Sequence, residues 1–263
     1  MSWPWEVAER DHELQNPTSA EKIRLVGDYM RLDDRTRVLD VACGKGGPAR
    51  ILAATYGCRV HGIEIRPVFA EQAREQAAAA GLDALIEVET ADAAKVQLEP
   101  DSYDAALCLG AAFVWGTIAD AAAALRPVVP DGAYVAIGEP FWRVWPLPDA
   151  VDPQEFVTLP VTAARFTDAG FELTGIVAAS EDDWDRYESL HWRAVEEWLA
   201  DHPGGPEADE VRSTHERRRD DHLRYERALE GWAIFVGRKA RGTKVATCQR
   251  PDPMSSVSST GMA

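Results

Sequence analysis

Two glycines and two acids stand at positions where they can form a nucleotide site. The segment Val38–Gly46 is a short apolar run that ends in a glycine turn. Gly44 and Gly46 lack Cβ atoms, so a ligand can lie directly against the backbone there. Glu64 ends the next apolar run, where a carboxylate accepts hydrogen bonds from ribose hydroxyls, and Asp92 follows the third, within reach of an adenine amino group. The spacing predicts a site for a nucleoside-containing cofactor.

The residues of the turn favour S-adenosylmethionine over other nucleotides. The pattern Gly44-x-Gly46-x-x-Ala49 also fits a dinucleotide site, which keeps NAD as an alternative. Asp40 would place a carboxylate beside the NAD pyrophosphate, an unfavourable contact between like charges. S-adenosylmethionine has no phosphate and carries a sulfonium and an ammonium group, which an acid favours. A P-loop is excluded because Gly46, and no Ser or Thr, follows Lys45.

S-adenosylmethionine can donate the methyl group of its sulfonium, and an acceptor for that group is expected beside residues that follow the fourth and fifth predicted strands. Trp115, Trp142 and Arg143 are candidates to contact it, and Glu139 is a candidate base or an anchor for a cationic acceptor. A base is needed only if the acceptor carries a proton at the working pH. The alternatives are that the tryptophans only pack the core and that Glu139 forms a structural ion pair with an arginine.

An aromatic stripe further along the chain gives a second set of acceptor candidates. Trp184, Tyr187, His191 and Trp198 recur at helical spacing, which is typical of a core-facing helix. The alternative is a lid in which Trp184 and Tyr187 close over the acceptor. His12, near the N-terminus, is a candidate to cover the cofactor or to act as a base, and the alternative is a surface histidine.

Strands and helices alternate along the chain, which predicts a doubly wound α/β fold with a mostly parallel, seven-stranded Rossmann-like sheet. The last strand is expected to be antiparallel, with a helical insert before it, at about residues 181–230. Residues 1–240 would form one domain and residues 241–263 a disordered tail. The expected strands are Arg37–Ala42, Cys58–Ile65, Leu85–Thr90, Tyr103–Gly110, Ala133–Gly138, Phe171–Ala178 and Gly231–Val236. A capping box at Thr18–Glu21, with Thr18 as the N-cap, is expected to begin the first long helix.

Net charge, apolar runs and cysteine spacing limit the expected binding partners and the expected cellular compartment. The 263 residues include 28 Lys and Arg against 44 Asp and Glu, a net charge of -16, which disfavours nucleic acid and anionic membranes. No apolar run is long enough to span a bilayer, and Met1–Glu6 lacks a secretory signal, so a cytoplasmic protein is expected. The four cysteines form no CxxC pair, and no Cys and His cluster at the short spacing of a zinc site. Reduced structural thiols and no metal are therefore predicted.

From about Glu21 to Lys239 the chain resembles the class I S-adenosylmethionine-dependent methyltransferases. Ala42 stands where many members have the first glycine of the turn, and Cys108–Ala111 matches the fourth-strand motif. The chain is also similar to a group of uncharacterised bacterial methyltransferases, through His12, Asn16-Pro17, Gly138–Arg143, Trp184–Glu188 and Gly231-Trp232. The resemblance implies that the cofactor contacts Asp40, Cys43, Gly44, Gly46, Glu64, Asp92, Ala93 and Leu109.

These features predict a methyltransferase that transfers a methyl group from S-adenosylmethionine to a small-molecule acceptor. The first alternative is a non-catalytic S-adenosylmethionine-binding regulator or partner subunit. The second is an NAD-dependent oxidoreductase, for which no hydride-acceptor site is identified. No motif specifies the acceptor, the atom that is methylated or the oligomeric state.

Overall fold

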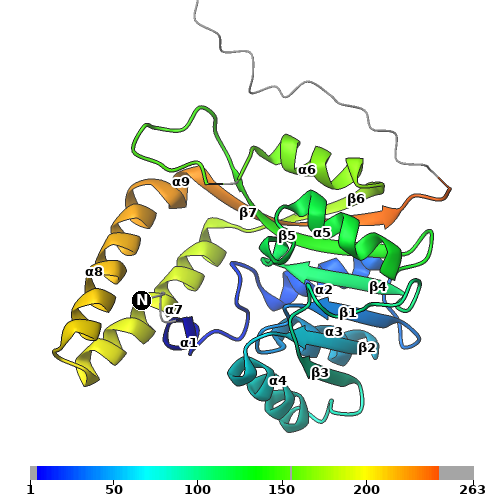
Figure 1. The fold of residues 1–263 in the computed structure, drawn as a ribbon, viewed down its shortest axis with the longest axis horizontal. Helices are drawn as coiled ribbons and strands as arrows, with labels where there is room; N and C mark the ends of the chain where they lie inside the picture. The colour runs from blue at the N-terminus through cyan, green and yellow to red at the C-terminus, as the bar shows by residue number, and fades with distance from the viewer. Residues whose placement is uncertain (1–4, 155, 243–263) are drawn as a thin grey trace, which may run out of the picture.

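Seven strands form a single sheet whose order is β3-β2-β1-β4-β5-β7-β6 (Figure 1). The computed structural model describes residues 5–154 and 156–242, so the predicted tail lies, except for its first two residues, outside the described part of the chain. The first five strands are parallel, and β7 runs antiparallel to both β5 and β6. This is the predicted fold. The strands are β1 (Arg37–Val41), β2 (Arg59–Glu64), β3 (Ile86–Thr90), β4 (Ala105–Leu109), β5 (Tyr134–Trp142), β6 (Phe171–Ala178) and β7 (Glu230–Lys239).

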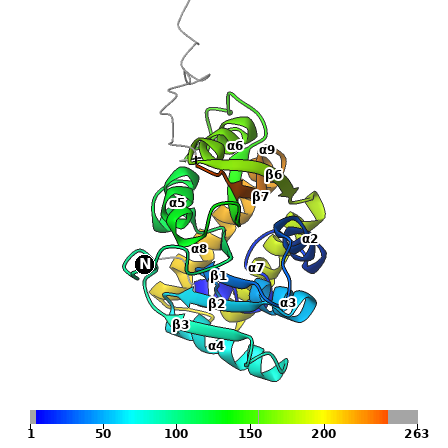
Figure 2. The same ribbon diagram turned by 90° about the vertical axis from the view of Figure 1, so that its right-hand side faces the viewer.

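Helices cover both faces of the sheet, and each face has its own apolar core. The helices α2 (Ala20–Met30), α3 (Gly47–Tyr56) and α4 (Pro67–Ala79) pack on one face, and α5 (Ile118–Leu125) and α6 (Leu159–Asp168) pack on the other. Figure 2 shows α5 on one side of the strands and α2 and α3 on the opposite side. Because both faces are covered, the central strands are buried along nearly their whole length.

A helical insert between β6 and β7 lies beyond the carboxyl ends of the parallel strands, to the left of the sheet in Figure 1. It comprises α7 (Glu181–Asp201), α8 (Pro206–Asp221), a π-helical turn (His222–Glu226) and α9 (Arg227–Leu229). The short helix α1 (Trp5–Ala8) packs against α7. Through this contact, α1 and the insert lie together near the edge of the sheet where ligands bind in this class of fold.

Three details of the predicted elements were wrong, and one is the end of β7, which continues to Lys239 beyond the predicted Val236. The N-cap of α2 is Ser19, whose Oγ accepts the Lys22 N–H, whereas the neighbouring Thr18 is buried with its hydroxyl unpartnered among the described residues. β5 continues to Trp142, beyond the predicted Gly138, because pairing with β7 extends to Glu230. Trp142 therefore lies on the strand and not after it.

The described cysteines, Cys43, Cys58 and Cys108, are buried free thiols, and Cys248 lies outside the described residues. Within the described part of the chain, no helix is both long and apolar enough to cross a membrane.

Candidate active site

A cavity of about 250 Å³, here called the first cavity, lies where β1 turns into α3. The turn requires left-handed backbone at three positions, with φ of +54° at Ala42, +56° at Gly44 and +72° at Gly46. The glycines adopt this conformation without strain, whereas Ala42 brings its Cβ close to the carbonyl oxygen that follows. The turn exposes backbone to the cavity, and Gly46 caps the start of α3.

Asp40 supplies a buried carboxyl group to the wall of this cavity. Its Oδ2 atom has no hydrogen-bond partner among the described residues, and the side chain is almost completely enclosed. Burial, reinforced by the negative charge of Glu64, raises the pKa of Asp40 to about 7. An enclosed carboxylate without a donor is unfavourable unless a cationic group is bound beside it.

Glu64 joins the ends of β1 and β2 beside the same cavity. Its Oε2 accepts the Gly44 N–H at 3.0 Å, and its Oε1 accepts the Arg66 N–H at 2.8 Å. These two bonds fix the carboxylate at the cavity wall, where each oxygen retains a lone pair for a ligand hydroxyl.

Residues 9–17, the N-terminal arm, cover the cavity from the other side. The Gln15 Oε1 atom accepts the Lys45 N–H at 2.8 Å and lies 2.0 Å from where a Cβ on Gly44 would stand. The Asn16 Nδ2 atom donates to the Leu109 carbonyl at 3.1 Å. A larger residue at position 44 would displace the Gln15 side chain from its contact with Lys45, and the φ of +56° also favours glycine there.

The N-terminal arm contributes cavity residues that the sequence did not predict. Glu13, Gln15 and Asn16 all line the cavity, yet Asn16 was noticed only as part of a shared dipeptide. Asn16 Oδ1 lies 2.0 Å from where a Cβ on Gly110 would stand, so Gly110 has the same role at β4 that Gly44 has at β1. Arg66, Phe69 and Phe113 also line the cavity and were not predicted.

A second cavity of about 280 Å³ adjoins the first at the ends of β4 and β5. Gly110 and Phe113 line both cavities, so the two spaces share a wall. The second cavity is lined further by Thr117, Glu139, Gln154 and Phe156. It thus combines two aromatic rings with a carboxylate, a hydroxyl and an amide.

The structure brings five of the eight predicted cofactor residues to the first cavity: Asp40, Cys43, Gly44, Glu64 and Leu109. It does not bring the other three there. Gly46 lies against Ala73 of α4, and Ala93 is buried in the core. Asp92 forms an ion pair with Lys95 at 2.8 Å and accepts the Ala94 N–H, so its carboxylate stabilises its own turn.

Among the predicted acceptor residues, Glu139 lines the second cavity and the others do not. Trp115 packs against the core, and the Trp142 indole is buried with its Nε1 donating to the Pro153 carbonyl. The Arg143 guanidinium donates to the Glu230 carbonyl. Extension of β5 explains the position of Trp142, since the residue points into the protein from a strand.

Trp184, Tyr187 and His12 line neither cavity. Trp184 packs in the core beneath the insert, the helix-stripe alternative. The Tyr187 hydroxyl donates to Glu9 at 3.1 Å, and His12 Nε2 lies 2.9 Å from the Tyr187 carbonyl. The contacts of Tyr187 and His12 join the N-terminal arm to α7.

The first cavity suits S-adenosylmethionine better than NAD. The unpartnered Asp40 oxygen fits a cationic group, and Glu64 fits ribose hydroxyls. The Lys45 ammonium donates to the carbonyls of Glu9 and Arg10 in the arm, so it is directed away from a phosphate in the cavity. The chemistry of the wall is therefore that of a site for a phosphate-free cationic nucleoside.

Comparison with known proteins gives the same family. A family model described as a methyltransferase domain matches residues 38–130. The uncharacterized protein YjhP of Escherichia coli K12 is 30% identical over 237 residues, which span 88% of this chain and 95% of that protein.

Two solved structures extend the comparison to bound cofactor product. A SAM-dependent methyltransferase from Thiobacillus denitrificans, crystallised with S-adenosylhomocysteine, is 30% identical, has a TM-score of 0.83 and covers 91% of this chain and 100% of its own. A second SAM-dependent methyltransferase, from Geobacter sulfurreducens with the same ligand, is 29% identical and also has a TM-score of 0.83. The match covers 89% of this chain and 97% of that chain.

Proposed function

Since the chain belongs to the class I S-adenosylmethionine-dependent methyltransferases, we propose that it methylates a small cationic molecule held in the second cavity. The observation that carries the proposal is the shared wall: Gly110 and Phe113 face the cofactor cavity and also the cavity that contains Glu139. An acceptor beside Glu139 would be adjacent to the cofactor. When bound, S-adenosylmethionine supplies an electrophilic methyl group.

The first cavity holds S-adenosylmethionine by charge attraction and by hydrogen bonds. The Asp40 carboxylate offers its free oxygen to a cationic group, and Glu64 accepts hydroxyl hydrogens. Gln15 and Asn16 close the cavity from the arm side. A cofactor bound here displaces water from the cavity, and the lower dielectric then strengthens each of these contacts.

The second cavity selects the acceptor and positions it. A volume of about 280 Å³ suits a small molecule. Phe113 and Phe156 offer ring faces that attract a cation, and the Glu139 carboxylate adds an opposite charge. Glu139 can also accept a proton from the acceptor atom if that atom is protonated. Alignment of the acceptor with the bound methyl donor provides most of the acceleration.

A panel of small amines, with matched alcohols and carboxylic acids, tests the proposal. Purified protein is incubated with S-adenosylmethionine and each compound, and S-adenosylhomocysteine release is measured. The proposal predicts turnover with one or more amines. Glu139→Gln should raise KM for that amine at least about tenfold, because a charge-assisted hydrogen bond contributes about 1.5–3 kcal/mol.

The matched control is Glu99→Gln, at an exposed acid in the connection between β3 and β4. It should leave KM unchanged, and neither variant should alter the affinity for S-adenosylmethionine. Turnover with an alcohol or an acid alone would contradict the cationic acceptor. Tight cofactor binding without turnover of any compound, including a cell metabolite extract, would favour the non-catalytic alternative.

A further inference from the structure

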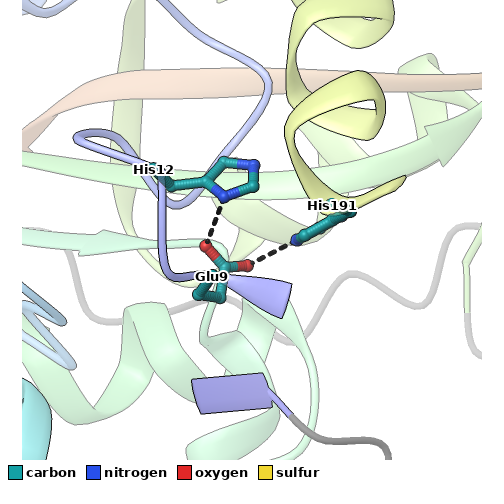
Figure 3. A group of neighbouring side chains, drawn as sticks. All are labelled: Glu9, His12 and His191. Atoms are coloured by element: carbon teal, nitrogen blue, oxygen red, sulfur yellow. Dashed lines mark hydrogen bonds and ion pairs between the residues drawn. The ribbon is translucent and has the colours of Figure 1, made fainter. Parts of the chain in front are cut away.

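Three side chains from distant parts of the sequence meet beside the N-terminal arm, outside both cavities. Glu9 follows α1, His12 lies in the arm, and His191 lies on α7; Figure 3 shows all three pointing toward one another. Each of the three residues is only 3% exposed. One ligand atom from each lies within 4.8 Å of the other two.

The hydrogen-bonding pattern leaves two acceptor atoms facing each other. His12 Nε2 lies 2.9 Å from the Tyr187 carbonyl, so this nitrogen carries a hydrogen. In a neutral imidazole the other nitrogen, Nδ1, then presents a lone pair. It lies 3.4 Å from Glu9 Oε2, and neither atom has a hydrogen-bond partner among the described residues. Two buried acceptors in this arrangement repel each other unless a proton or a metal ion lies between them.

The spacing and the surroundings match a metal site. Zinc binds imidazole nitrogen and carboxylate oxygen at about 2.0–2.2 Å, and tetrahedral coordination then separates two ligand atoms by about 3.4 Å. His191 Nε2 lies 2.9 Å from Glu9 Oε1, a hydrogen-bond distance that would lengthen by about 0.5 Å around zinc. His191 Nδ1 faces Glu188 Oε1 at 3.8 Å. Each histidine thus turns one nitrogen toward Glu9 and the other toward a carbonyl or a carboxylate. Metal-binding histidines are oriented by such partners.

We propose that Glu9, His12 and His191 bind a zinc ion that fastens the N-terminal arm to α7, with three protein ligands and a fourth position left for water. The sequence predicts no metal because its cysteines and histidines do not cluster at short spacing, and His191 reaches the arm only through the fold of the insert. Two imidazoles and one carboxylate are a ligand set that suits zinc and related divalent transition metals.

Occupation of this site would act on the cofactor cavity through the arm. The Lys45 ammonium donates to the Glu9 carbonyl at 2.6 Å, and the Lys45 N–H donates to Gln15. The proposed metal site is therefore connected, through Lys45, to the glycine turn and to Gln15 at the cavity. A fixed arm should favour the closed cavity and so raise the affinity for S-adenosylmethionine.

Metal titration tests the site directly. Full-length protein without a polyhistidine tag is stripped with a chelator, exchanged into metal-free buffer and titrated with Zn²⁺, then separately with Co²⁺. The expected results are saturable binding of one equivalent, a rise in Tm, and visible absorption from a low-symmetry Co²⁺ complex. S-adenosylmethionine should bind more tightly to the zinc-loaded protein than to the stripped protein.

Variants identify the ligands. His191→Ala and Glu9→Gln should each weaken Zn²⁺ binding by more than the roughly 10–100-fold typical of losing an outer-shell partner. His61→Ala is the control, because His61 lies on β2 and pairs with Glu89, far from the arm. Glu9→Gln preserves the shape of the side chain, so its circular dichroism in chelator should remain that of the folded wild type, although loss of the buried pair with His191 lowers Tm.

Two outcomes would overturn the proposal. One is the absence of saturable Zn²⁺ and Co²⁺ binding by folded wild-type protein, which would mean that a proton on His12 is the cation facing Glu9. The other is unchanged Zn²⁺ affinity in both His191→Ala and Glu9→Gln, which would place the bound metal elsewhere.

Discussion

Replacing Asp40 by asparagine should stabilise the cofactor-free protein and at the same time remove cofactor binding. Burial, together with the charge of Glu64, raises the pKa of Asp40 from 3.8 to about 7. A pKa unit corresponds to about 1.36 kcal/mol. The ionised Asp40 therefore destabilises the folded state by about 4 kcal/mol at pH 8, where the carboxyl group is deprotonated in both folded and unfolded chains.

The dependence on pH has a definite sign. Because folding raises the pKa of this carboxyl, its destabilising effect is absent below about pH 4, grows as the pH rises, and is complete above about pH 7. A buried amide without partners costs about 1–3 kcal/mol at any pH. Asp40→Asn should thus gain about 2 kcal/mol at pH 8, which raises Tm by about 4–8 °C in a chain of this size. The gain should disappear at pH 5.

Thermal unfolding at pH 5 and pH 8, with and without S-adenosylmethionine, measures both effects. The cofactor should raise Tm of the wild type and leave Tm of Asp40→Asn unchanged, because the variant lacks the charge that faces the cationic ligand. Asp83→Asn, at an exposed acid, is the control and should behave as the wild type. The reasoning is refuted if Asp40→Asn lowers Tm equally at both pH values, or if the cofactor stabilises this variant as it stabilises the wild type.

Three further predictions concern the glycine turn and the insert. Glu64→Ala should weaken S-adenosylmethionine binding by about 1.5–3 kcal/mol in isothermal titration, and unchanged affinity would remove Glu64 from the site. Ala42→Gly should relieve left-handed strain and raise the unfolding free energy in urea by up to about 1 kcal/mol; a loss of stability would show that the strain is not there. Trp184→Ala should lower the unfolding free energy by about 3–5 kcal/mol, because the ring is buried in the core, while cofactor affinity changes less than about twofold. Lost turnover at unchanged Tm would instead restore the lid interpretation of Trp184.

The fold was predictable because its signals are local. Short apolar runs that alternate with helical periodicity predict parallel strands with crossover helices, and the sheet confirms this. Glycines and an acid at the end of β1 likewise place the cofactor cavity. The predicted end of β5 was wrong because pairing between Trp142 and Glu230 joins residues that are far apart in the sequence.

The contacts of the N-terminal arm could not be predicted from the sequence, because they are long-range and polar. Gln15 contacts Lys45, Asn16 contacts Leu109, and His12 contacts Tyr187 of the insert. Periodicity carries no information about such pairs. The glycines at positions 44 and 110 gave an indirect signal, since each leaves space that an arm side chain fills.

Transfer of an isotopically labelled methyl group shows whether the protein methylates a small cationic molecule. The protein is incubated with S-adenosylmethionine that carries a deuterated methyl group, together with a bacterial metabolite extract, and the products are identified by mass spectrometry. We expect one or a few small cationic compounds to gain the labelled methyl in equal amount to the S-adenosylhomocysteine formed, and no such product with Asp40→Asn. S-adenosylhomocysteine formed without a labelled small molecule, or labelled product from Asp40→Asn at the wild-type rate, would contradict it.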